Sequence, residues 1–200
     1  SGNPFSFYKN KFCHSMAWAN SLHSYSKLDI LPQYKEARFI GHLKGSFWLG
    51  MREGAKDRLL NRFRLNTFDL SDEEFQNYFM VFKKNKFNYI YGYTSILSQF
   101  SIYLLENKLV PLKLHCPTLK SCIVTAEMCI EEDRKFIEKA LGISVYREYG
   151  ASEVSIIAIE DKHLNWWIST GRLWVEVVDE SNKPLQHGDV GKIIITDLYN

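Results

Sequence analysis

The sequence lacks an excess of either charge, a long apolar run and an export signal. Among its 200 residues, 25 are Lys or Arg and 23 are Asp or Glu, so the formal net charge is only +2. Charges that nearly cancel create no long-range field for a polyanion. No stretch reaches the ~18 apolar residues that a membrane span needs, and no basic segment followed by an apolar run opens the chain. We therefore predict neither a nucleic-acid partner nor a membrane span.

Cysteine is scarce, and its spacing fits no structural zinc site. The four cysteines lack paired Cys-x-x-Cys spacing, and a chain that is 46% hydrophobic can build a core without disulfide staples. We predict free thiols in a reducing cytoplasm, with those in or beside strands buried. The cysteines are Cys13, Cys116, Cys122 and Cys129.

A length of 200 residues fits one globular unit or a large piece of a bigger domain. Residues 1–4 have a turn composition with no element before them, and residues 197–200 follow directly on an apolar strand. We therefore expect an internal fragment of a longer chain.

Strands and helices alternate through the middle of the chain. The short apolar runs 88–91, 121–124 and 143–146 predict strands. Amphipathic periodicity predicts helices over 94–106 and 131–141. Alternation at this spacing predicts an α/β fold in which a parallel sheet with right-handed crossovers is flanked by helices.

Helix signals also occur outside this unit. Apolar residues at helical spacings predict a helix over about 9–28. Ser71 is a helix start, because its hydroxyl can accept from the backbone of Glu74 while the Glu74 carboxylate reaches back. Gly142 suits a helix C-terminus. The segment 36–50 fits either a strand or a loop, since its three glycines favour close approach to other backbone or to a ligand.

The helical period disappears past residue 165. Apolar residues predict strands over 172–178 and 192–196, and turn residues separate them. We therefore divide the chain into an α/β core at 1–165 and an antiparallel β region at 166–200.

Three turns are expected at the carboxyl ends of the strands, where open parallel sheets bind ligands. They span residues 92–95, 125–127 and 149–153. The third combines an aromatic ring, a glycine, small residues, a hydroxyl and a carboxylate. These groups offer a flat face for a purine, accessible backbone and an oxygen ligand for Mg²⁺. The same residues also fit a plain β-turn with Ser152 as a helix cap and Glu153 in solvent.

Several of these segments resemble the motifs of a known family. Residues 149–153, Tyr-Gly-Ala-Ser-Glu, resemble the Tyr-Gly-x-(Ser/Thr)-Glu motif of adenylate-forming enzymes. Residues 125–127 lie where that family carries an adenosine-contacting (Gly/Ala)-Glu turn. Residues 66–71 and 88–95 resemble segments of the phenylacetate-CoA ligase and capsular-polysaccharide branch. Together the similar segments cover most of residues 60–200.

The resemblance implies an ATP-dependent, AMP-forming ligase of the acyl-CoA synthetase type, which activates a small-molecule carboxylic acid as an acyl-adenylate. The implied cofactors are ATP and Mg²⁺. The expected acceptor is a thiol such as that of coenzyme A, with a carrier protein or a sugar amine as alternatives, and the branch implies a role in capsular polysaccharide biosynthesis. The phosphate loop, the ribose-binding aspartate and the lid domain with its lysine would lie mostly outside these 200 residues. The fragment alone is therefore expected to be inactive.

The family's roles can be carried over residue by residue. Glu153 would be the catalytic residue that holds Mg²⁺, and Ser152 would lie near the phosphates. The other implied nucleotide contacts are Tyr149, which would stack on adenine, and Gly150, Ala151, Ala126 and Glu127. The residues implied for the acyl pocket are Tyr91, Gly92 and Tyr93.

The sequence departs from the family pattern in two places. Thr94 stands where proline is common, and Ser-Ile-Ile at 155–157 replaces glycines that phenylacetate-type members often carry, so an aryl acid is not favoured. Two other classes stay open. One is a Rossmann-like nucleotide-dependent enzyme, although no Gly-x-Gly-x-x-Gly follows an expected strand. The other is a non-catalytic binding or assembly protein that retains the fold.

Overall fold

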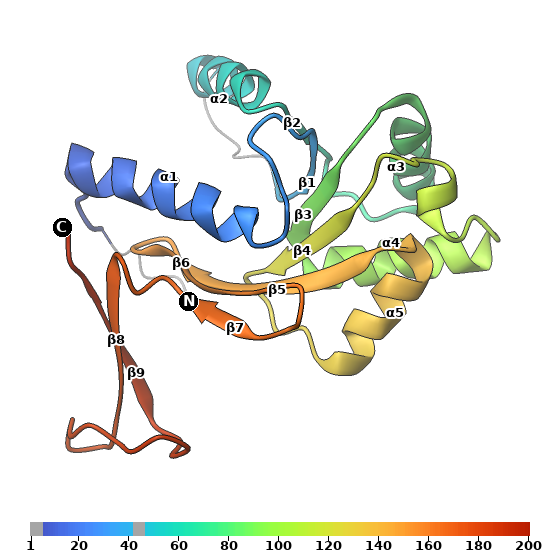
Figure 1. Ribbon diagram of the computed structural model, residues 1–200. Helices are drawn as coiled ribbons and strands as arrows, with labels where there is room; N and C mark the ends of the chain where they lie inside the picture. Colours follow the sequence, from blue (N-terminus) through green and yellow to red (C-terminus); the bar gives the residue numbers. More distant parts are fainter. Residues whose placement is uncertain (1–5, 42–46) are drawn as a thin grey trace.

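The computed structural model describes residues 6–41 and 47–200. The turn expected at 1–4 and part of the segment 36–50 lie outside these residues. Figure 1 shows a twisted sheet with helices on both faces and a β-hairpin that extends away from it. This arrangement confirms the predicted α/β fold with an additional antiparallel β region.

Among the described residues, seven strands form the main sheet, in the order β2-β1-β3-β4-β5-β6-β7. The first five are parallel, and β6 and β7 continue the sheet as antiparallel strands. The chain passes outward from β1 to β2 and then places β3 on the other side of β1, so a topological switch point lies between β1 and β3. The strands are β1 (Glu36–Phe39), β2 (Arg62–Arg64), β3 (Tyr89–Tyr93), β4 (Ser121–Thr125), β5 (Ser144–Ala151), β6 (Ser155–Glu160) and β7 (Trp166–Ile168).

Helices cover both faces of this sheet. The side chains of α3, α4 and α5 form a core with one face, whereas α1 crosses the opposite face and packs on β6 (Figure 1). The sequence did not predict α2, which connects β1 to β2. The helices are α1 (Lys11–Ser26), α2 (Phe47–Leu59), α3 (Asp72–Lys84), α4 (Thr94–Glu106) and α5 (Glu131–Leu141), with a 3-10 turn at Leu112–Leu114.

The ends of the helices follow local capping signals. Helices α4 and α5 have the predicted bounds, and Gly142 ends α5 at φ 72° with its N–H donating to the Glu138 carbonyl at 2.7 Å. At the start of α3, the Ser71 hydroxyl accepts from the Glu74 N–H at 3.3 Å, as predicted. The reciprocal contact was predicted wrongly. The Ser71 N–H donates to Asp69 Oδ1 at 2.9 Å, because an Asp two residues earlier forms an Asx turn.

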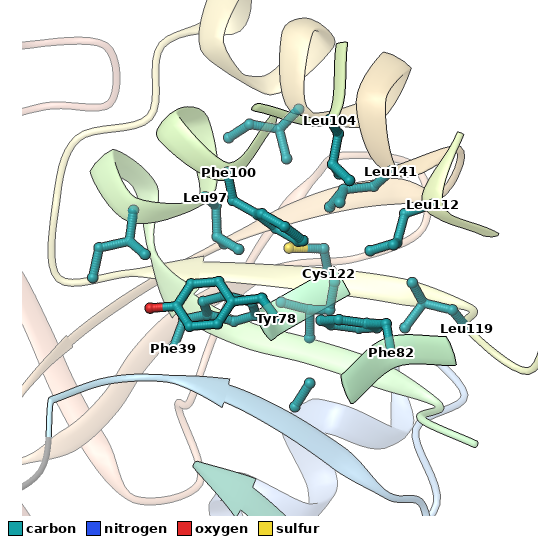
Figure 2. Packing of buried hydrophobic residues seen from close by; sticks show 14 of the residues in the cluster. Phe39, Tyr78, Phe82, Leu97, Phe100, Leu104, Leu112, Leu119, Cys122 and Leu141 are labelled. Carbon is teal, nitrogen blue, oxygen red and sulfur yellow. The ribbon is translucent and has the colours of Figure 1, made fainter. Parts of the chain in front are cut away.

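An aromatic core fills the space between the sheet and α3–α5. Figure 2 shows Phe39 of β1 packed among side chains of α3 and α4. Its ring centroid lies 6.2 Å from that of Phe82 and 5.8 Å from that of Phe100, spacings at which aromatic pairs attract. Cys122 of β4 lies in the same core. All four cysteines are free and buried, as predicted for those near strands.

The hairpin consists of β8 (Leu173–Val178) and β9 (Lys192–Asp197), which form a separate two-stranded antiparallel sheet. A buried ion pair between Arg172 and Asp197 joins the two ends of the hairpin at its base. The Cys13 thiol of α1 donates to Asp197 Oδ2 at 3.4 Å and so connects this base to α1. The predicted strands of this region are therefore confirmed. Within 6–41 and 47–200, none of the helices has the length and apolar character to cross a membrane.

Candidate functional site

The carboxyl ends of β3, β4 and β5 lie side by side at one edge of the sheet. Parallel pairing places Tyr93 opposite Thr125 and Val124 opposite Arg147, so the three predicted site segments converge at this edge. The expected placement of these segments is confirmed. The roles assigned to individual residues stay predictions.

A pocket of about 470 Å³ opens beside this edge, between α1 and the polar face of the sheet. Its walls include Arg38 of β1 and Tyr91 of β3, which flank the switch point where open α/β sheets bind ligands. Ala126 after β4 and Gly150 of β5 also line it. The pocket therefore joins segments that are far apart in the sequence.

The Tyr-Gly-Ala-Ser-Glu segment differs from the predicted turn. Strand β5 continues through Tyr149 to Ala151, because this stretch pairs with antiparallel β6 with a register shift between Tyr149 and Gly150. A Cβ at Gly150 would lie 2.8 Å from the Ser155 carbonyl oxygen, so only glycine permits this approach. The Tyr149 side chain is 46% exposed, which leaves its ring accessible for stacking.

The segment after β4 brings a residue with a left-handed backbone conformation, Ala126, and a carboxylate, Glu127, to this edge of the sheet. Ala126 has φ 64°, a left-handed conformation that glycine adopts more easily, and it lines the pocket. The Glu127 carboxylate accepts from the Ser95 N–H at 2.7 Å and from the Ser95 hydroxyl at 3.0 Å. Glu127 therefore satisfies a backbone donor at the N-terminus of α4, where negative charge is favoured.

Ser152 and Glu153 form the turn between β5 and β6. Both are exposed, and no hydrogen bond or ion pair engages the Glu153 carboxylate among the described residues. The Lys9 Nζ donates to the Ser152 carbonyl at 2.7 Å, which brings a cation beside this turn. A free carboxylate is a suitable ligand for Mg²⁺, an ion that usually takes one or two protein carboxylates and fills its shell with phosphate and water oxygens. The site thus fits the magnesium role expected of Glu153.

A buried carboxylate that the sequence did not single out lies beside the motif. Glu148 Oε1 accepts from the Tyr91 hydroxyl at 2.8 Å and from the Thr125 hydroxyl at 3.1 Å, and Oε2 accepts from the Tyr25 hydroxyl at 3.1 Å. Burial raises the pKa of Glu148, and these three hydrogen bonds partly oppose the rise. The network holds α1, β3, β4 and β5 together beneath the pocket.

A second buried carboxylate joins β1 to the edge strand β2. Glu36 is fully buried and accepts from Nε of both Arg38 and Arg62, the latter at 3.2 Å. The Tyr89 hydroxyl donates to Glu36 Oε2 at 2.6 Å. These charged residues were not predicted as site residues. The sequence signal for them is the Glu-x-Arg pattern of a short strand. It indicates a charged pair on one face of the strand only when the residues between and after them are known to pack in the core.

The residues expected in the acyl pocket divide between the two faces of β3. Tyr91 and Tyr93 line the pocket. Gly92 is buried on the other side, where a Cβ would lie 2.5 Å from the Phe39 Cβ. Its function in the structure is close approach between β1 and β3, and the pocket wall at this level comes from the two tyrosines.

No protein-family model matches the chain, and no curated protein sequence matches it. Solved structures do. A 2-hydroxyisobutyryl-CoA ligase, solved with 2-HIB-AMP and CoA, is 18% identical with a TM-score of 0.73 over 94% of this chain. The chain shares the fold of acyl-CoA ligases.

Two further ligases have the same arrangement. MatB from Rhodopseudomonas palustris is 13% identical with a TM-score of 0.61, and a benzoate CoA ligase from Burkholderia xenovorans LB400 is 12% identical with a TM-score of 0.64. Each match covers 92% of this chain. The chain spans 41% of the 2-hydroxyisobutyryl-CoA ligase, 36% of MatB and 37% of the benzoate ligase, so it corresponds to about two fifths of such proteins.

Proposed function

We propose that the protein containing this chain is an ATP-dependent, AMP-forming ligase that activates a carboxylic acid as an acyl-adenylate. The observation that carries the proposal is the pocket at the switch point, into which the ends of β3, β4 and β5 bring the motif-bearing segments. The fold shared with acyl-CoA ligases supports it.

The nucleotide half of the reaction would use the end of β5. The exposed ring of Tyr149 would stack on adenine, while Gly150 and Ala151 present backbone without a bulky side chain in the way. Glu153 would hold Mg²⁺, which when bound would supply positive charge to the phosphates. Lys9, held beside Ser152 at 2.7 Å, would add a second positive charge near the phosphates.

The acid half would use the part of the pocket beside β3 and α1. Tyr91 and Tyr93 would form its walls, and Glu148 would fix the Tyr91 hydroxyl through the 2.8 Å hydrogen bond. No side chain needs to act as a nucleophile, since the substrate carboxylate attacks the phosphorus directly. The chain therefore contributes by positioning the reactants and stabilising developing charge.

The proposal also covers the acceptor of the activated acyl group and the branch of the ligase family. Transfer to the thiol of coenzyme A is supported by the fold of CoA ligases. Membership of the phenylacetate-CoA ligase and capsular-polysaccharide branch is supported by the similar segments at 66–71 and 88–95. We also propose residues 1–165 as the nucleotide- and acyl-binding core and 166–200 as a β region that adjoins it.

ATP–pyrophosphate exchange by the full-length protein, measured with a panel of carboxylic acids, tests the proposal. Acid-dependent exchange is expected, because formation of the adenylate is reversible while pyrophosphate is present. A non-catalytic protein with this fold would give no exchange with any acid. A nucleotide-dependent enzyme of another class would turn over ATP without requiring the acid.

A further inference from the structure

Two arginines line the pocket with unused hydrogen-bond donors. Arg38 and Arg62 each direct Nε to Glu36, but their terminal nitrogens have no hydrogen-bond partner among the described residues. Their side chains are only 14% and 13% exposed. A guanidinium that is largely removed from bulk water and keeps free donors is suited to bind an anion.

The charges around this arginine pair do not cancel locally. One carboxylate, Glu36, faces two guanidiniums, and it is also engaged by the Tyr89 hydroxyl at 2.6 Å. The other acid of this face, Glu148, accepts from three hydroxyls, and burial raises its pKa. Lys9 lines the same pocket. An excess of positive charge therefore remains beside Arg38 and Arg62.

Aromatic rings hold both guanidiniums in place. The guanidinium carbon of Arg38 lies 4.5 Å from the centroid of the Tyr91 ring, and that of Arg62 lies 5.5 Å from the Trp18 ring. The Nε bonds to Glu36 fix the other side of each planar group. Since side chains already ordered lose little entropy on binding, the pair is preorganised for a carboxylate.

We propose that Arg38 and Arg62 bind a second carboxylate on the acid, so that the preferred substrates are dicarboxylic acids. The inference rests on the proposed ligase activity for the carboxylate that is activated at the other end of the pocket. It assigns a specificity-determining role to strands β1 and β2, which carry none of the motif segments.

The test compares diacids of four to six carbons with their monoamides in ATP–pyrophosphate exchange by the full-length protein. The monoamide keeps the size and polarity of the diacid but removes one charge. We expect kcat/KM for the best diacid to exceed that for its monoamide at least about 10-fold, the range of a charge-assisted hydrogen bond. Arg62→Gln should lower the diacid value about 10- to 100-fold and change the monoamide value by less than about 3-fold.

Arg64→Gln is the matched control. Arg64 lies on the same short strand, is equally buried and is paired with Asp57 of α2 at 3.0 Å, but it does not line the pocket. Arg64→Gln should leave the ratio of kcat/KM for the diacid to kcat/KM for the monoamide unchanged. Arg62 is the better position for the test than Arg38, because the Arg38 guanidinium also lies 4.5 Å from the ring of Tyr91, a residue expected in the acyl pocket. Melting curves of the Arg62→Gln and Arg64→Gln variants show whether they are folded.

The outcomes separate this inference from the proposed function. Equal rates for diacids and monoamides, or an equal loss in both arginine variants, would overturn the dicarboxylate inference and leave the ligase intact. Absence of exchange with every acid would refute the ligase itself. In that case, calorimetric titration of the wild type and both variants with the diacids tests the anion site. Weaker diacid binding only in Arg62→Gln would support the site, and unchanged binding would refute it. Weaker ATP binding by Arg62→Gln without any acid would assign the arginines to a nucleotide phosphate and would also refute the inference.

Discussion

Replacing Glu153 by Gln in the full-length protein separates a magnesium ligand from a surface turn residue. The Glu153 carboxylate is exposed and has no partner among the described residues, so no native contact is lost. The free energy of unfolding should change by less than about 0.5 kcal/mol. If the carboxylate binds Mg²⁺ at the α-phosphate, the exchange rate should fall about 10²- to 10³-fold, the typical loss of one electrostatic partner in a transition state.

Glu127 provides a matched comparison, because it is the glutamate of the neighbouring motif segment. Its carboxylate makes two hydrogen bonds to Ser95 at the N-terminus of α4, at 2.7 and 3.0 Å. Glu127→Gln keeps one acceptor oxygen but loses the charge, so stability should fall by about 0.5–1 kcal/mol. Its effect on the exchange rate should be smaller than that of Glu153→Gln.

The assay is ATP–pyrophosphate exchange as a function of Mg²⁺ concentration, together with urea unfolding of each variant. Loss of rate with unchanged unfolding, and a higher Mg²⁺ requirement, is the expected result for Glu153→Gln. An exchange rate within a few-fold of the wild type would refute the metal role. A rate loss accompanied by an equal loss for Glu127→Gln would show that the whole edge had been disturbed.

Three further predictions concern stability of the full-length protein. Gly92→Ala should destabilise by more than about 2 kcal/mol in urea unfolding, because the new Cβ would lie 2.5 Å from the Phe39 Cβ; a neutral effect would contradict the close approach of β1 and β3. Ala126→Gly should raise stability by up to about 1 kcal/mol, since φ 64° costs a non-glycine residue more, and a loss would show that this strain is absent. Burial raises the folded-state pKa of Glu148 above its unfolded value, so the folded state binds the proton more tightly and the associated stability is lost as pH rises through the folded pKa. The unfolding free energy of wild type minus that of Glu148→Gln should therefore increase as pH is lowered from about 7 to about 5, and a decrease would contradict the direction of the pKa shift.

Elements with their own local signals could be predicted from the sequence. Helix α5 begins with three acidic residues and ends at Gly142, and its predicted bounds are those of the structure. Helix α2 was missed because Gly50 and Gly54 weaken its helix propensity, and its place depends on contacts with β2 such as the pairing of Arg64 with Asp57.

The place of the candidate site in the sheet could be predicted from the sequence, but several of the residues around it could not. The motif segments follow strands of one parallel sheet, so their convergence follows from topology alone. The contact between Tyr25 and Glu148 joins residues 123 positions apart, and no local pattern shows that α1 would cross that face. The arginine pair is hidden for the same reason, since β1 and β2 become neighbours only when the sheet forms. The extension of β5 through Tyr149 reflects pairing with β6, which overrides the turn character of the Tyr-Gly pair.

Alternation along β1 has a consequence for how specificity could change. Ala37 and Phe39 belong to the core, whereas Glu36 and Arg38 lie on the opposite face. Neighbouring positions in the chain are therefore constrained differently, the first two by packing and the other two by charge. Replacement of Arg38 alone removes a positive charge from the pocket and leaves the packing around Phe39 in place. If Arg38 and Arg62 bind the acid as proposed, a mutant library confined to positions 38 and 62 would sample new acids while the aromatic core stays unchanged. Such a strand separates the residue proposed to bind the acid from those that pack the core.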